Sequence, residues 1–145
     1  MLCSFMLISF ISFFSSWKID SSNIYLENWN DVISNKEIII SNALGKIGAL
    51  TSHKLIFLWF GICAFTIPFY VFLIALRFLG IKTLNLFKSF TNTIITLLYF
   101  PVFIANFFGA TIYSGSMGHY MNLYLIDLFG IFGSSTILIS LLTLY

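Results

Sequence analysis

The strongest constraint on the fold is the placement of the charged residues, which leaves long apolar stretches uncharged. No Asp, Glu, Lys or Arg occurs in residues 55–76 or 89–126. A helix needs about 20 apolar residues to cross the hydrocarbon core of a bilayer. We therefore predict an all-α integral membrane protein with four transmembrane helices. The predicted spans cover residues 1–17, 55–79, 90–110 and 123–145.

The composition also favours a lipid environment. Hydrophobic residues make up 59% of the 145 residues and charged residues 8%, whereas soluble domains carry about 25% charged residues. A soluble domain of this size could not bury so much apolar surface, because small domains have a high ratio of surface to volume. The net charge of +2 and the scattered basic residues do not form a nucleic-acid surface. The expected partner is therefore the lipid bilayer.

The first predicted span ends at residues typical of a membrane interface. As a helix, residues 1–16 extend roughly 24 Å, slightly less than the hydrocarbon core. Trp17 and Lys18 follow, as aromatic belts and snorkelling lysines do. A cleaved signal peptide is the competing interpretation, but it needs a positive segment before the apolar stretch. The first basic residue is Lys18, so we predict a retained span.

The polar residues of the chain are concentrated in residues 18–54, where the charges sum to zero. The first part of this segment is rich in Ser and Asn, as loops are. Residues 38–53 place apolar side chains at helical spacing: Ala43, Leu44, Ile47 and Leu50. This pattern predicts an amphipathic helix between the first and second spans, lying in the membrane interface.

Basic residues between the second and third spans predict the orientation. Arg77, Lys82 and Lys88 give this connection a charge of +3, whereas the connection before the fourth span has no Lys or Arg. Short loops rich in Lys and Arg stay in the cytoplasm. The second connection is therefore predicted to be cytoplasmic and residues 18–54 extracytoplasmic, with both termini in the cytoplasm.

The sequence contains no recognisable catalytic machinery. Its nearest fragment to a phosphate-binding loop, Gly45-Lys46-Ile47-Gly48, lacks the spacing and the Ser or Thr of that motif. His53 and His119 stand alone, without the spacing of metal ligands. Cys3 and Cys63 lie in apolar stretches, as small buried hydrophobic residues do. We expect no enzyme activity, no cofactor and no metal.

Two polar residues within the predicted spans are candidates for a function inside the membrane. Asp127 lies about one turn inside the fourth span, and an acid in such a position suggests proton or cation handling. The alternative is a hydrated residue near the outer interface, paired with His119 or a main-chain group. Asn106 lies at a similar depth on the third span, so a hydrogen bond from Asn106 to Asp127 could join the two helices.

Small residues and a proline predict how the helices pack and bend. Gly130 and Ser134 stand four apart on the fourth span, with Gly133 beside them, and this spacing lets helices approach closely. Gly61 is a weaker case on the second span. Pro68 is predicted to kink that span, because proline removes a main-chain hydrogen bond inside a helix.

Three stretches of the sequence carry a family resemblance. The first is Trp17-Lys18-Ile19-Asp20, directly after the first span. The second runs from Leu44 to His53 and continues at Trp59-Phe60-Gly61-Ile62, and the third runs from Gly118 to Gly133. In this order, with these loop lengths, the chain resembles the four-transmembrane N-terminal region of the FtsK/SpoIIIE-type DNA translocase, in the form seen in Bacteroidetes-like sequences.

The resemblance implies a role in cell division and chromosome partition. In that family this region anchors the translocase in the bacterial inner membrane at the septum and contacts other division proteins. A linker and a hexameric ATP-driven motor follow it. The resemblance also leads us to expect a multi-pass homo-oligomer that makes no direct contact with nucleic acid. The candidate interaction residues are Gly45, Lys46, Gly48 and His53, and the candidate packing residues are Gly130, Gly133 and Ser134.

The sequence departs from the family pattern at both ends. The family usually has a short basic segment before the first span, whereas here that span begins at Met1. No Walker motif or DNA-reading domain follows the fourth span, so we expect a piece of a longer translocase or a gene without its motor. The alternative is a small proton- or ion-handling subunit of a membrane complex. Measuring proton flux after Asp127 is replaced by Asn would distinguish the two, because a clear loss of flux would favour transport.

Overall fold

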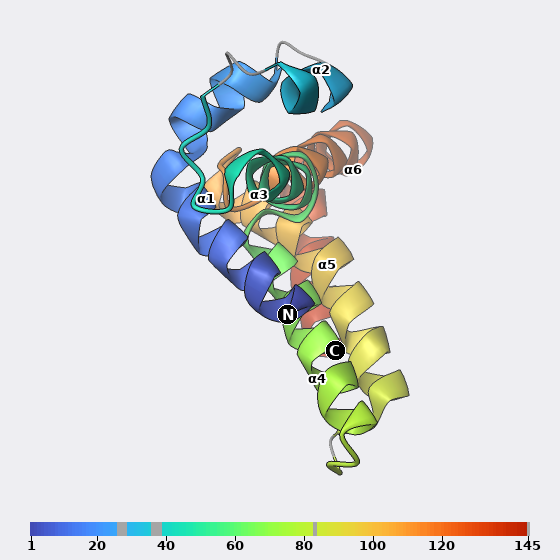
Figure 1. Ribbon diagram of the computed structural model, residues 1–145. Helices are drawn as coiled ribbons and strands as arrows, with labels where there is room; N and C mark the ends of the chain where they lie inside the picture. The colour runs from blue at the N-terminus through green and yellow to red at the C-terminus, as the bar shows by residue number, and fades with distance from the viewer. Residues whose placement is uncertain (26–28, 36–38, 83, 145) are drawn as a thin grey trace.

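The chain folds into helices joined by short connections (Figure 1). The structure is a computed structural model and describes residues 1–25, 29–35, 39–82 and 84–144. Within these ranges there is no strand, so the predicted all-α class is confirmed. The helices are α1 (Leu2–Tyr25), α2 (Trp29–Ser34), α3 (Gly45–Ser52), η1 (His53–Phe60), η2 (Gly61–Phe65), α4 (Thr66–Phe78), α5 (Leu86–Phe108) and α6 (Gly115–Leu144).

Among the residues that the structure describes, three helical runs are long and apolar enough to cross a membrane. They are Gly45–Phe78, Leu86–Phe108 and Gly115–Thr143, and Leu2–Lys18 of α1 is a shorter apolar helix. These helices fit a multi-pass membrane protein. Residues 26–28 and 36–38 of the predicted extracytoplasmic segment, and Tyr145 of the fourth predicted span, lie outside the described residues.

The run from α3 to α4 changes direction at Gly61. Here η1, which is π-helical, gives way to the 3₁₀ helix η2. Gly61 has φ 59° and ψ −141°, a conformation that glycine adopts readily and other residues do not. Figure 1 shows α3 nearly end-on while α4 runs down the view. The bend predicted at Pro68 therefore lies at Gly61, and Pro68 sits in the first turn of α4, where a missing N–H is tolerated.

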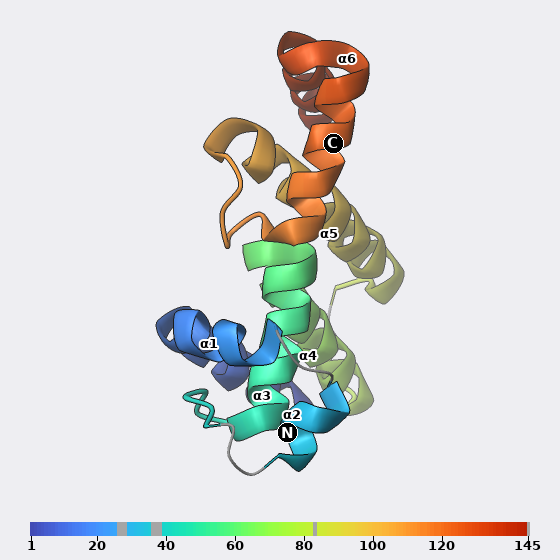
Figure 2. The same ribbon diagram turned by 90° about the horizontal axis from the view of Figure 1, so that it is seen from above.

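Helix α6 is bent in a similar way at Gly130, which has φ 71° and ψ 171°. Residues 115–129 continue the line of α3 and η1, as Figure 2 shows from above. Residues 131–144 then run beside α5 in the opposite direction. Two bonds show this antiparallel course: Ser135 Oγ donates to Asn106 Oδ1, and the Tyr99 hydroxyl donates to Leu138 O.

The apolar core lies where α1 crosses the bend at Gly61. Phe10 and Phe13 stand three apart on α1 and so share one face, and both are fully buried. They pack in one cluster with Ile56 of η1 and Ala64 of η2. Helix α1 therefore forms one wall of the core.

Hydrogen bonds fix the connection before α3 to α1. Ser9 Oγ donates to Gly48 O (2.6 Å), and Asn42 Nδ2 donates to Ser9 O (3.1 Å). The Ser41 N–H donates to Asp20 Oδ1 (2.7 Å). These polar groups are buried together, so each supplies the partner that the other needs away from water.

The amphipathic helix predicted over residues 38–53 begins at Gly45 instead. Residues 39–44 form turns and irregular backbone, held by the bonds to α1, and Ile38 lies outside the described residues. The buried residues of α3 are Gly48, Ala49, Leu50 and Ser52. The placement of this helix at a membrane interface stays a prediction.

Candidate functional site

The end of η1 and the start of α6 meet in a junction of main-chain contacts. The Ile62 N–H donates to Tyr113 O (2.9 Å). On the other side, Ser116 Oγ donates to Phe57 O (3.1 Å). The carbonyl end of one helix thus faces the N–H end of the next, so their dipoles are aligned head to tail.

Two glycines with positive φ allow this close approach. A Cβ atom on Gly61 would lie 1.9 Å from Tyr113 O, and one on Gly115 would lie 2.5 Å from Trp59 O. Real Cβ atoms do not come so close to main-chain atoms, so any larger residue would separate the two helices. The small-residue contact predicted for Gly61 is therefore a main-chain contact at a bend, rather than packing of two regular helices.

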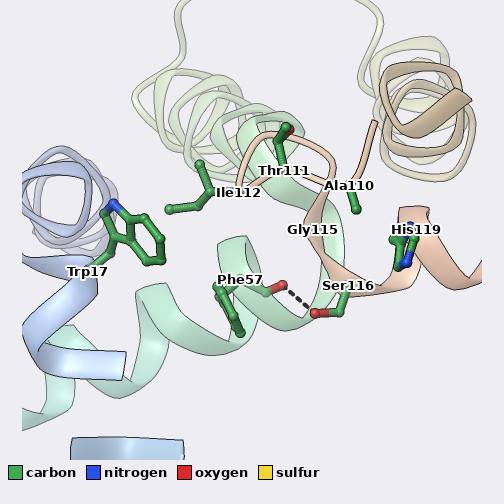
Figure 3. Close-up of a pocket in the computed structure, with 8 residues that line it drawn as sticks. All are labelled: Trp17, Phe57, Ala110, Thr111, Ile112, Gly115, Ser116 and His119. Atoms are coloured by element: carbon green, nitrogen blue, oxygen red, sulfur yellow. Dashed lines mark hydrogen bonds between the residues drawn. The ribbon is translucent and has the colours of Figure 1, made fainter. Parts of the chain in front are cut away.

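A cavity of about 280 Å³ lies beside the junction (Figure 3). Its largely apolar lining comes from α1, η1, the connection before α6 and the start of α6: Trp17, Phe57, Ala110, Thr111, Ile112, Gly115, Ser116 and His119. Figure 3 shows Trp17 and His119 on opposite sides of it. Among the described residues, the polar side chains of this lining are one imidazole and two hydroxyls.

His53, a predicted interaction residue, is buried with 3% of its surface exposed. Its ring stacks on Phe57 (5.0 Å between centroids), which stacks in turn on Trp17 (6.4 Å). His53 Nδ1 has no hydrogen-bond partner among the described residues. His119 lies across the cavity, and the described part of the chain has no group of three or more His, Cys, Asp or Glu that could hold a metal.

The other three predicted interaction residues lie at the start of α3. Gly45 has φ 63° and open space around it, and Lys46 Nζ donates to Asn35 O. Gly48 is buried, and a Cβ atom there would lie 2.6 Å from Leu44 Cβ. Gly45 and Lys46 are thus partly exposed, whereas Gly48 is required by internal packing.

A polar cluster joins α5 to both parts of α6. Asn106 Nδ2 donates to Asn122 Oδ1 (2.8 Å) and to Ser134 Oγ (3.1 Å), and Ser135 Oγ donates to Asn106 Oδ1 (2.8 Å). Asn122 and Ser134 are buried. The sequence pattern indicated Asn106 and Ser134 but not Asn122 and Ser135, whose signal is a polar side chain within an apolar helix.

Asp127 stands apart from this cluster. It is exposed, and its side chain makes no hydrogen bond or ion pair with the described residues. The bond considered between Asn106 and Asp127 is therefore wrong: the bend at Gly130 brings Ser134 and Ser135 to Asn106 instead. Gly133 is half-buried, and a Cβ atom there would lie 3.0 Å from Phe129 Cβ of its own helix.

Comparison with known protein families shows the family to which the chain belongs. The model of the 4TM region of DNA translocase FtsK/SpoIIIE matches residues 1–145, the whole chain. The chain belongs to this family. The resemblance seen in the sequence is thus confirmed. No curated protein and no solved structure matches the chain.

The stretches that carried the resemblance converge in this FtsK/SpoIIIE membrane region. Trp17 of the first stretch and His119 of the third line the cavity. Trp59 and Gly61 of the second stretch form the junction beside it. The family describes the membrane region of the translocase and not its ATPase motor, and no enzymatic domain is shown on this chain.

Proposed function

We propose that this chain anchors an FtsK-like DNA translocase in the bacterial inner membrane and recruits it to the division septum. Recruitment would take place through contacts with other division proteins of the membrane. The observation that supports the proposal is the match of the entire chain to the membrane region of the translocase. The apolar helices supply the anchor, and the role in cell division and chromosome partition requires no catalysis by this chain.

The proposed orientation places α2 and α3 outside the cytoplasm. Figure 1 shows the connection between α4 and α5 at the opposite end of the molecule from α2. Arg77, Lys82 and Lys88 lie at or near that connection, and positive loops stay in the cytoplasm. Both termini would then be cytoplasmic. A topology reporter fused after Tyr145 is expected to be active only in the cytoplasm, and extracytoplasmic activity would contradict the orientation.

The surface proposed for recruitment lies around α3 and the connection before it. Ile39 and Ile47 are exposed there, with 79% and 63% of their surfaces accessible. The bonds that Ser41 N–H donates to Asp20 and that Asn42 Nδ2 donates to Ser9 O hold this connection in place. A partner binding here would order few additional groups, and this preorganisation favours affinity.

Imaging of a fluorescent fusion in dividing cells of the source organism tests recruitment. The unaltered chain is expected to concentrate at the septum. Ile47→Ser is expected to lower this enrichment, because it removes an exposed apolar contact from the proposed surface. Ile81→Ser is the matched control, since Ile81 is exposed and lies in the connection between α4 and α5, away from the proposed surface. Uniform membrane signal of the unaltered chain would overturn the proposal.

We further propose that copies of the chain associate with each other. The support is the family resemblance, in which a hexameric motor follows this region and brings several membrane regions together. Measurement of particle mass in lipid nanodiscs is expected to show oligomers. A strictly monomeric population at all protein concentrations would contradict this part of the proposal.

The ion-handling alternative depends on Asp127. This residue is exposed and lies outside the polar cluster around Asn106. An anchor is therefore expected to give liposomes no more proton flux than lipid alone, and Asp127→Asn is expected to change nothing. A flux that appears with the chain and disappears in Asp127→Asn would favour transport.

A further inference from the structure

The connection between α4 and α5 carries positive charge that no acid of the surrounding sequence balances. Arg77 lies in the last turn of α4, Lys82 in the connection and Lys88 in the first turn of α5. No Asp or Glu occurs in residues 38–126. Figure 1 shows this connection at the lower end of the molecule, apart from α1, α2 and α3. A balancing negative charge must therefore come from outside this stretch of the chain.

Two of the three basic side chains share one hollow on the surface. This basic hollow has a volume of about 360 Å³, and among the described residues its lining is Arg77, Gly80, Ile81 and Lys82. A guanidinium presents planar N–H donors that match the oxygens of a phosphate, and an ammonium adds a compact positive charge. The pair of side chains in the basic hollow is therefore suited to a phosphate group.

The main chain at the end of α4 fixes the shape of the basic hollow. The Ile81 N–H donates to Leu76 O (3.1 Å), and the Gly80 N–H donates to Arg77 O (3.1 Å). Together these bonds form the Schellman motif that ends many helices, and Gly80 has the positive φ that the motif requires, 77°. Because the main chain is already ordered, binding of an anion would order only the two basic side chains, which favours affinity.

The start of α5 does not offer free main-chain donors to the same anion. Asn85 Oδ1 accepts bonds from the N–H groups of Phe87 (3.1 Å) and Lys88 (3.5 Å). A side chain thus caps the groups with which a helix start binds anions. An anion in the basic hollow would therefore depend on the side chains of Arg77 and Lys82.

Exposed apolar side chains next to the basic hollow indicate where the phosphate comes from. Phe78 and Leu79 have 88% and 75% of their surfaces accessible, and Phe87 has 80%. Contact with water is unfavourable for such side chains, whereas lipid acyl chains cover them while the basic groups reach the headgroups. A phospholipid supplies both the phosphate and the acyl chains, but a soluble phosphate supplies only the first.

We propose that Arg77 and Lys82 bind the phosphate of an anionic phospholipid whose acyl chains lie against Phe78 and Leu79. A zwitterionic headgroup also carries an ammonium, and residues 38–126 contain no carboxylate to pair with it. The site therefore selects lipids with a net negative charge. The proposal does not depend on septal recruitment, and under the proposed orientation the bound lipid lies in the cytoplasmic leaflet.

Lipid titration of the purified full chain in detergent micelles tests the site. Phosphatidylglycerol and phosphatidylcholine with the same acyl chains are compared, and native mass spectrometry counts the lipid molecules that stay bound. The unaltered chain is expected to bind its first phosphatidylglycerol at least about tenfold more tightly than phosphatidylcholine, because two basic side chains contribute. Arg77→Gln and Lys82→Gln are each expected to lower this affinity about fivefold, and the double variant about thirtyfold.

Lys88→Gln is the matched control, because it removes the same charge from the same region but from outside the lining of the basic hollow. At 0.15 M salt it is expected to lower the affinity by less than about twofold, since salt screens a charge that does not touch the headgroup. Exchange of the two residues, Arg77→Lys with Lys82→Arg, keeps both charges and is expected to retain most of the affinity. This second variant separates loss of charge from damage to the fold.

Glycerol phosphate distinguishes a lipid site from a site for soluble phosphates. At equal ionic strength it is expected to displace no phosphatidylglycerol, because it lacks acyl chains. Displacement at the concentration of the lipid would overturn the proposal in favour of a soluble ligand. Equal affinities for the two lipids would also overturn it. An effect of Lys88→Gln as large as those of Arg77→Gln and Lys82→Gln would show that total charge, rather than the basic hollow, attracts the lipid.

Discussion

At Gly61 and at Gly130 the chain bends with similar φ angles, 59° and 71°, but in different surroundings. A Cβ atom on Gly61 would lie 1.9 Å from Tyr113 O, whereas one on Gly130 would meet nothing within 4 Å. The first bend is enclosed by main chain of the connection before α6 and of the first residue of α6, and the second is held by side-chain hydrogen bonds. A bend enclosed in this way belongs to the scaffold, whereas a bend held by a few side chains can open.

The largest effect is expected for Gly61→Ala, which tests whether the first bend is fixed. The positive φ costs a residue with a Cβ about 1–3 kcal/mol, and the overlap with Tyr113 O adds about 1–3 kcal/mol. We expect a loss of about 4 kcal/mol in the free energy of unfolding, measured by denaturation in lipid bicelles. Gly80→Ala is the control, because Gly80 has φ 77° and open space. Equal losses in the two variants would contradict a fixed bend at Gly61.

The next largest effect is expected for Asn106→Leu, which releases the second bend. The variant removes three side-chain hydrogen bonds, each worth about 0.6 kcal/mol in a membrane protein. We expect a loss of about 2 kcal/mol in the same unfolding measurement. Asn92→Leu, which changes an exposed asparagine on the same helix, should stay within about 0.5 kcal/mol of the unaltered chain. A loss in Asn106→Leu no larger than in this control would remove the cluster as the cause of the bend.

Gly130→Ala compares the two bends directly. Its strain is expected to be relieved by a local change at residue 130, which gives up the bonds of Asn106 to residues 131–144 (the arm) and gains main-chain bonds. We therefore expect a loss of only about 1 kcal/mol, near the difference in helix propensity and side-chain bonds. If Gly130→Ala destabilises the protein as much as Gly61→Ala does, the arm is as fixed as the scaffold.

The smallest effect is expected for Tyr99→Phe, which removes the bond from the Tyr99 hydroxyl to Leu138 O. One such bond is worth about 0.6 kcal/mol in a membrane protein. In the background of Asn106→Leu the arm is already released, so the second change should cost almost nothing. A double-mutant cycle measures this coupling. Fully additive losses would show that the two residues hold independent contacts.

The sequence was sufficient for the fold class and insufficient for the bends. Uncharged stretches identify apolar helices because charges are costly in lipid, and α5 at Leu86–Phe108 covers most of the predicted stretch 90–110. A glycine in such a stretch can permit close packing of two helices or can break its own helix. The spacing of the neighbouring residues in the sequence is the same in the two cases, so the pattern does not distinguish them. At Gly61 the partner that decides between them is Tyr113, far away in the sequence.

The candidate site was recovered in part for a related reason. His53 and Gly48 were selected for interaction, but both are buried, His53 with its ring on Phe57 and Gly48 with its carbonyl bonded to Ser9 of α1. A polar or small residue in a membrane protein can serve an exposed surface or an internal contact, and sequence pattern does not separate the two. Asn106 was identified because its amide must find partners in lipid, but its partners depend on a bend that the pattern did not indicate.

The packing of α1 has a consequence for the order of events during synthesis. Cys3 Sγ donates to Pro68 O, which is 65 residues later in the chain, and Phe10 packs with Ala64. At about 5–20 residues per second, these partners emerge about 3–13 seconds after α1. Gly48, whose carbonyl accepts the bond from Ser9 Oγ, is made 39 residues after Ser9 and emerges about 2–8 seconds later. The first helix therefore spends several seconds in the membrane before the segments that bury it exist.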